Sequence, residues 1–168
     1  MNLGLQATLN GTISTNATTL MKTINDLKLE YTTEGKFIFS ELGSIVLGKT
    51  IEKGTKMTLH DAMFQIMTII GMRDTTFNPK IDRLKIAPGG YTDRVAWGTA
   101  SNRMAHILGD EAGNGGLFST VSDVITQMQL LLNKGKMPGV FRVFQEDTVN
   151  KFLNVTKYKY TNTRCLGW

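Results

Sequence analysis

The residues with the clearest chemical potential lie between positions 112 and 120, which read Ala-Gly-Asn-Gly-Gly-Leu-Phe-Ser-Thr. Three of the four residues from 113 to 116 are glycine, and two hydroxyl residues that can cap a helix follow at Ser119 and Thr120. Asp123 comes three residues after Thr120, which fits the capping-box pattern. The segment predicts a tight turn fixed against a helix N-terminus, with backbone amides that could face a ligand. Alternatively, the glycines only permit positive φ angles and close packing beneath a helix, and the segment alone favours this second interpretation.

Other short blocks stand before and after this turn. They are 37–49 (Phe-Ile-Phe-Ser-Glu-Leu-Gly-Ser-Ile-Val-Leu-Gly-Lys), 70–77 (Ile-Gly-Met-Arg-Asp-Thr-Thr-Phe), 86–88 (Ile-Ala-Pro), 97–99 (Trp-Gly-Thr) and 166–168 (Leu-Gly-Trp). Their order and spacing resemble the serine β-lactamase-like hydrolases, which include penicillin-binding proteins, class C β-lactamases and related esterases. The likeness is strongest over residues 31–168 and is closest to the β-lactamase-related branch. It implies that Gly113, Asn114, Gly115 and Gly116 belong to a loop of the substrate cleft.

The chemistry implied by this resemblance needs three elements at one cleft. They are a Ser-x-x-Lys at a helix start, a Tyr-x-Asn or Ser-x-Asn on a loop, and a Lys/His-x-Gly on an edge strand. The serine attacks an amide or ester carbonyl after a lysine or tyrosine takes its proton, and backbone amides stabilise the oxyanion.

Two of the three elements do not occur in the sequence. It contains no Ser-x-x-Lys, and no Lys/His-x-Gly follows residues 166–168. The segment 19–22 (Thr-Leu-Met-Lys) has the first spacing with threonine in place of serine. It stands about twenty residues before the second element, far closer than the family places it, so we interpret it as a chance pattern on a helix surface.

The second element corresponds to Phe39, Ser40 and Glu41, and it departs from the family pattern twice. Phe39 has no hydroxyl that could exchange a proton, and Glu41 replaces the usual Asn or Asp. We expect Ser40 to cap a helix rather than to act as a nucleophile. The sequence therefore assigns no catalytic residue, and the degenerate motif of Phe39, Ser40 and Glu41 is the candidate for one.

Two functional hypotheses follow. In the first, the chain is a fragment or degenerate copy of a serine hydrolase and is catalytically incompetent on its own. In the second, it is a non-catalytic binding or structural subunit of a larger assembly. A third, in which another chain supplies the missing elements, is disfavoured because Phe39 would remain. Extending the coding frame upstream to look for Ser-x-x-Lys, and downstream to look for His/Lys-x-Gly, would discriminate between these hypotheses.

Composition bounds the class of protein. A chain of 168 residues with 41% hydrophobic and 20% charged residues suits one soluble globular domain. The formal net charge is +5, and residues 149–168 carry four basic residues and no acidic one. Four charges are more typical of a solvated face than of a nucleic-acid site, so we expect no nucleic-acid partner.

Metal and cofactor sites are not indicated. Cys165 is the only cysteine, which excludes an internal disulfide, and His60 and His106 lack metal-ligand spacing. No segment has the length of a membrane span or the pattern of a signal peptide. We therefore expect no cofactor, no metal and no membrane span, and the compartment stays open. Asn10, Asn16 and Asn154 begin glycosylation sequons, which matter only on a secretory route.

Apolar periodicity predicts a mainly α fold with at most a small, marginal sheet. Helices are expected over 17–27, from a Ser40 cap to Gly54, from a Thr58 cap to Gly71, and over 99–108, 121–133 and 146–153. Residues 73–98 are expected to be irregular, and weak strand candidates lie at 36–39 and in the C-terminal tail. The helix over 121–133 carries Val121, Val124, Ile125, Met128, Leu131 and Leu132 on one stripe, and the helix after Thr58 is expected to bury Leu59, Ala62, Met63, Ile66, Met67 and Ile70.

The resemblance implies that residues 1–168 are a single partial domain, the helical lobe of an α+β fold, without the sheet that both chain ends build in the family. Helix faces that would pack on that sheet are then exposed. The residues concerned are Met63, Ile66, Met67, Val124, Met128 and Leu131. We expect self-association, or a protein partner that covers this helical face.

Overall fold

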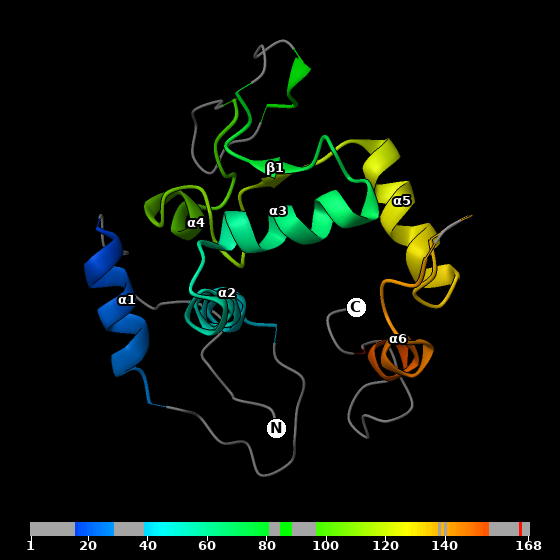
Figure 1. Cartoon of the computed structure of the whole chain (residues 1–168). Helices are drawn as coiled ribbons and strands as arrows, with labels where there is room; N and C mark the ends of the chain where they lie inside the picture. Colours follow the sequence, from blue (N-terminus) through cyan, green and yellow to red (C-terminus); the bar gives the residue numbers. More distant parts are fainter. Residues whose placement is uncertain are drawn as a thin grey trace.

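The computed structural model describes residues 16–28, 39–80, 85–88, 97–137, 139, 141–154 and 165. The described residues are mainly helical, as the periodicity predicts (Figure 1). The helices are α1 (Ala17–Asp26), α2 (Glu41–Thr55), α3 (Leu59–Ile70), α4 (Arg103–Ile107), α5 (Val121–Leu132) and α6 (Glu146–Leu153). Each predicted helix is confirmed, although the one expected over 99–108 is shorter. None of the described helices is long and apolar enough to cross a bilayer.

Polar side chains fix where the helices begin. Asn16, Ser40, Thr58, Asn102 and Thr120 each accept a hydrogen bond from a backbone N–H in the first turn of the helix that follows. The predicted Ser40, Thr58 and Thr120 caps are therefore confirmed.

The helix ends match the prediction less well. Gly71 ends α3 with φ +84°, as expected of a left-handed C-terminal glycine. The prediction that Gly54 ends α2 was wrong. This helix continues through Thr55, and Lys56 takes the left-handed conformation with φ +58°.

A two-stranded antiparallel sheet joins two of the sequence blocks. Strand β1 (Thr76–Phe77) pairs with β2 (Leu117–Phe118), with Thr76 opposite Phe118 and Phe77 opposite Leu117. The prediction that residues 73–98 are irregular was wrong at β1. Of the predicted strand at 36–39, only Phe39 lies within the described residues, and it is not in a strand. Helix α3 lies between α2 and this sheet and also contacts α5 (Figure 1).

The first apolar core lies where α1, α2 and α4 meet. Its buried members are Leu20 and Ile24 of α1, Leu42 and Ile45 of α2, and Met104 of α4. Leu20 and Leu42 are fully buried. This core holds the N-terminal end of α2 against α4, the two elements that carry the candidate site.

The second apolar core joins α3 to α5. Met67, Ile70 and Met72 pack against Leu130 of α5. The prediction that Ile66 is buried was wrong, because its side chain is exposed. Met67, expected on an orphaned face, is instead a core residue, whereas Met63 is half-buried as part of the same cluster.

The apolar stripe of α5 faces away from that core. We define the α5 stripe as Val121, Val124, Ile125, Met128 and Leu132, all of which are exposed. Val121 is 78% and Leu132 is 81% exposed, whereas the buried residues of this helix are Asp123 and Leu130. Within the described residues, the apolar periodicity predicted for this helix therefore marks an uncovered face.

Candidate functional site

The degenerate second motif forms the start of α2. The Ser40 hydroxyl accepts a hydrogen bond from the Gly43 N–H at 3.3 Å, which places this side chain in a capping role. Phe39 directly precedes the cap, and its side chain is 65% exposed. The residue that the resemblance places at the family's tyrosine is thus accessible but has no hydroxyl.

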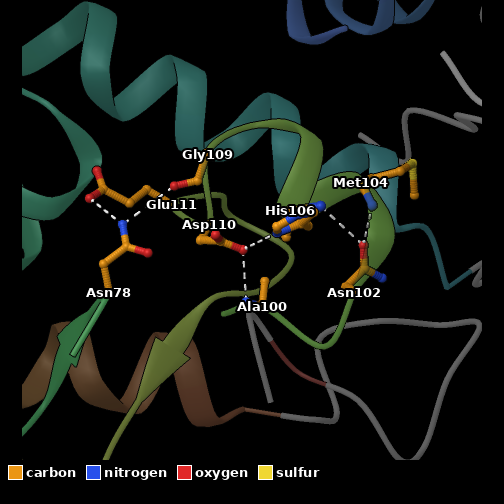
Figure 2. Close-up of polar contacts among 9 residues, drawn as sticks. Asn78, Ala100, Asn102, Met104, His106, Gly109, Asp110 and Glu111 are labelled. Carbon is orange, nitrogen blue, oxygen red and sulfur yellow. Dashed lines mark hydrogen bonds and ion pairs between the residues drawn. The ribbon is translucent and has the colours of Figure 1, made fainter. Parts of the chain in front are cut away.

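Asn102 joins this motif to the glycine-rich turn. Its Nδ2 donates to Glu41 Oε1 at 2.8 Å, and its Oδ1 accepts from Asn114 Nδ2 at 2.9 Å. The same Oδ1 caps α4 by accepting from the N–H groups of Met104 and Ala105, as Figure 2 shows for Met104. One amide therefore connects α2, α4 and the loop over 113–116.

The glycine-rich turn packs directly on the backbone of α2. A Cβ built at Gly113 would lie 1.9 Å from the Ser44 carbonyl oxygen, a distance that no real contact allows. A Cβ at Gly48 would likewise lie 3.1 Å from the Gly113 nitrogen. The seam between the two segments has no room for a water molecule. This contact agrees with the second interpretation of the glycines, in which they permit close packing, and the same packing brings the loop to α2.

The other end of the turn has its own steric constraint. Gly116 has φ +101°, and a Cβ there would lie 1.9 Å from the Asp110 carbonyl oxygen. Ala112 and Gly115 form a small bridge, in which each N–H donates to the other's carbonyl at 3.2 and 3.1 Å. The turn is therefore held in one conformation at both ends.

A second polar group fixes the segment that leads into the turn (Figure 2). Asp110 Oδ1 accepts from the Ala100 N–H and lies 2.8 Å from His106 Nδ1. Asn78 Nδ2 donates to Glu111 Oε1 at 3.0 Å. His106, one of the two histidines without metal-ligand spacing, is thus paired with Asp110. His60 packs edge-on against Phe64 and Phe77 instead.

Two further sequence blocks meet around a buried carboxylate. Asp123 Oδ2 accepts from the Asp74 N–H at 2.8 Å and from the Thr75 hydroxyl at 2.7 Å. The Thr75 hydroxyl also lies 2.7 Å from Ser119 Oγ. The capping-box prediction was therefore half right: Thr120 accepts from the Asp123 N–H, but the carboxylate bonds the β1 side of the molecule rather than the cap backbone.

Sequence reasoning missed the central residues of these groups. Asn102, Asp110 and the partners of Asp123 were not singled out. Asn is a favoured N-cap residue, but the helix was expected to begin at residue 99, so Asn102 fell inside it and its capping role was missed. The bonds to Glu41 and Asn114 cross 61 and 12 positions in the sequence, and no local pattern encodes them.

Other predicted site residues lie apart from this region. The segment 19–22 lies within α1, where Leu20 is in the core. Asn16 caps that helix, Asn154 follows α6, and Asn10 lies outside the described residues. No group of three His, Cys, Asp or Glu side chains that could hold a metal occurs in the described part of the chain.

A cavity of about 440 Å³ lies at the end of α5, remote from the motifs. Its lining includes Lys134, Lys136, Arg142 and Glu146. The Lys134 ammonium is 2.6 Å from Glu146, and the hydrogen bond and charge of Lys134 lower the pKa of that carboxyl. Arg142 donates to the carbonyls of Lys134 and Phe144. Two of these three cations are thus engaged within the protein.

A family model and curated relatives both match most of this chain. Residues 2–148 match the Beta-lactamase family model. A protein of Salmonella gallinarum (strain 287/91 / NCTC 13346), to which D-alanyl-D-alanine carboxypeptidase activity is ascribed, is 30% identical over 174 residues, covering 92% of this chain and 40% of that protein.

Solved structures share this fold. A protein from Bacteroides dorei DSM 17855, to which β-lactamase activity is ascribed, superposes with a TM-score of 0.62 at 17% identity, over 94% of this chain and 41% of that one. The octameric penicillin-binding protein homologue from Pyrococcus abyssi superposes with a TM-score of 0.58 at 17% identity, over 87% of this chain and 32% of that one.

The chain spans about 40% of the length of the curated relatives it matches. The family match nevertheless extends over most of its residues, and it includes the second motif, the glycine-rich turn and the blocks that meet at Asp123. The chain belongs to the β-lactamase family.

Proposed function

We propose that this chain forms the helical scaffold of a β-lactamase-like acyl-transfer site and does not carry out acyl transfer by itself. The family chemistry is hydrolysis of an amide or ester bond through a serine nucleophile. The observation that supports the proposal most directly is the second motif. Phe39 is exposed but has no hydroxyl, Ser40 is engaged as a helix cap, and Glu41 is bound by Asn102.

The sequence adds a second reason. A hydroxyl is a poor nucleophile unless a neighbouring base takes its proton, and the family uses the lysine of Ser-x-x-Lys for that step. The 168 residues contain no such motif. We propose a D-amino-acid amide as the bond that a site with this scaffold would cleave, because D-alanyl-D-alanine carboxypeptidase activity is ascribed to a relative that is 30% identical.

Covalent labelling tests this proposal. We expect the purified chain to form no acyl or phosphonyl adduct with a penicillin-type or fluorophosphonate probe, as measured by intact-protein mass. A working serine β-lactamase in the same reaction is the positive control. Phe39→Tyr should also stay unlabelled, because an acid/base without a nucleophile has nothing to activate. A stoichiometric adduct on Ser40, Thr19 or any other hydroxyl would contradict the proposal.

A binding or structural role is the second candidate, and the α5 stripe favours it. Burying apolar area contributes roughly 25 cal/mol per Å², so covering a few hundred Å² contributes several kcal/mol. That gain is comparable to the whole stability of a small domain. The Pyrococcus abyssi homologue is an octamer, which is consistent with assembly in this fold. We propose that the stripe is covered by a second copy or by another protein.

A further inference from the structure

We propose that Asn102 is a positioning residue that sets the glycine-rich turn relative to the Ser40–Glu41 end of α2, with Glu41 as its anchor rather than as a ligand-contacting group. The inference rests on the proposal that these segments form the family-type site. Glu41, which replaces the usual Asn or Asp of the motif, then serves as the acceptor that fixes the Asn102 amide.

The geometry carries the inference. Asn102 is the only side chain described here that bonds both Glu41 and Asn114, at 2.8 and 2.9 Å. Asn114 is flanked by Gly113, which lies against the Ser44 carbonyl, and by Gly115, which is in the bridge with Ala112. A displacement of Asn114 would therefore move a turn that has no spare space against α2.

The chemistry of position 102 is specific. A carboxamide donates through its nitrogen and accepts through its oxygen, and both functions are used here. The nitrogen meets a carboxylate acceptor, and the oxygen meets three N–H donors, from Met104, Ala105 and Asn114. An aspartate could supply the oxygen but not the donor, and it would place two carboxylates side by side.

This distinction separates positioning from simple capping. Asn and Asp are about equally good N-caps, so a residue that only begins α4 would tolerate Asn102→Asp. A residue that also holds Glu41 would not. Exchanging both partners, as Glu41→Gln with Asn102→Asp, restores one donor and one acceptor in the opposite direction.

Amide hydrogen exchange by NMR, performed on the full chain, tests the proposal. The reporters are the Ala112 and Gly115 N–H groups of the bridge, and the internal reference is the Val149 N–H of α6, which donates to the Gln145 carbonyl. We expect Asn102→Asp to speed exchange at the bridge by about tenfold or more, with no change at Val149. The double variant should return to within about twofold of the natural chain, and Glu41→Gln alone should change little, because glutamine still accepts.

Bridge exchange that is unaffected by Asn102→Asp would overturn the proposal, and so would a double variant that stays as fast as Asn102→Asp. If Asn102→Asp unfolds the chain, recovery of a cooperative urea transition in the double variant supports the role, and continued unfolding refutes it. Exchange rates and probe labelling are independent, so the failure of this inference is distinguishable from failure of the proposed function.

Discussion

The α2–α4–loop region and the outer face of α5 use polar and apolar residues in opposite ways. In the first, apolar side chains such as Leu42 are buried, and Asn102 joins three segments through one amide. In the second, the helix buries the carboxylate of Asp123 and exposes Val121 and Leu132. One region is closed on itself, whereas the other presents the kind of surface that proteins normally cover.

The difference shows what each region contributes. The closed region joins residues 39–41 and the glycine-rich turn through contacts among described residues. The open region exposes an apolar stripe that no described residue covers. Substitutions matched between the two regions should therefore have unequal effects on the free energy of unfolding.

The largest difference should come from truncating leucines. Leu42→Ala leaves a cavity in the first core and should lower the free energy of unfolding by about 2–5 kcal/mol. Leu132→Ala on the α5 stripe should change it by less than about 0.5 kcal/mol in the monomer. Urea denaturation of both variants measures the contrast. Equal losses would mean that the α5 stripe is covered.

A methyl group at the turn should have the next largest effect. Gly113→Ala forces a Cβ onto the Ser44 carbonyl and should cost about 2–3 kcal/mol. Gly54→Ala is the matched control in the same region, because nothing lies within 4 Å of its Cβ. That change should stabilise α2 by up to about 1 kcal/mol. Thermal unfolding that ranks the two variants in the opposite order would refute the close packing.

Asp123 tests the two hydrogen bonds that tie α5 to the segment before β1. Asp123→Ala leaves the Asp74 N–H and the Thr75 hydroxyl without their buried acceptor, and should cost about 1–3 kcal/mol. Asp123→Asn keeps one acceptor oxygen and should cost less. If both variants unfold at the natural urea midpoint, the carboxylate does not hold these segments together.

The smallest effect is expected at the exposed Lys134–Glu146 pair. Lys134 lowers the folded-state pKa of Glu146 through a hydrogen bond and its charge. The pair's contribution is therefore present above the unfolded pKa and is lost as the pH falls through the folded value. Glu146→Gln should unfold at a slightly lower urea concentration than the natural chain at pH 7, and this difference should shrink as the pH falls below the ordinary Glu pKa. A difference that grows toward acid would contradict this sign.

The sequence predicted elements better than it predicted their orientation. Periodicity and capping residues located each helix, because both signals are local. The same periodicity predicted one apolar face on α5 but did not reveal whether that face is inside, and it is Leu130, outside the predicted stripe, that enters the core. The two-residue strands β1 and β2 carry too few residues for a period of two to be visible.

The candidate site was predicted in part for a similar reason. Motif spacing predicted the family, and the structure brings Glu41 and Asn114 of the two motif segments to Asn102, but their roles as site residues stay a prediction. What joins them could not be predicted, because the Glu41–Asn102 bond depends on how α2 and α4 pack through Leu42, Ile45 and Met104.

Sedimentation velocity gives the most direct test that one region is closed and the other open. We predict that the natural chain associates as its concentration rises from low to high micromolar. A variant with Val121→Gln, Ile125→Gln and Leu132→Gln should keep its helical circular dichroism but remain monomeric. A well-folded natural monomer at high micromolar concentration, with no dye-accessible apolar surface, would contradict the account. It would show that the α5 stripe is buried within the chain itself.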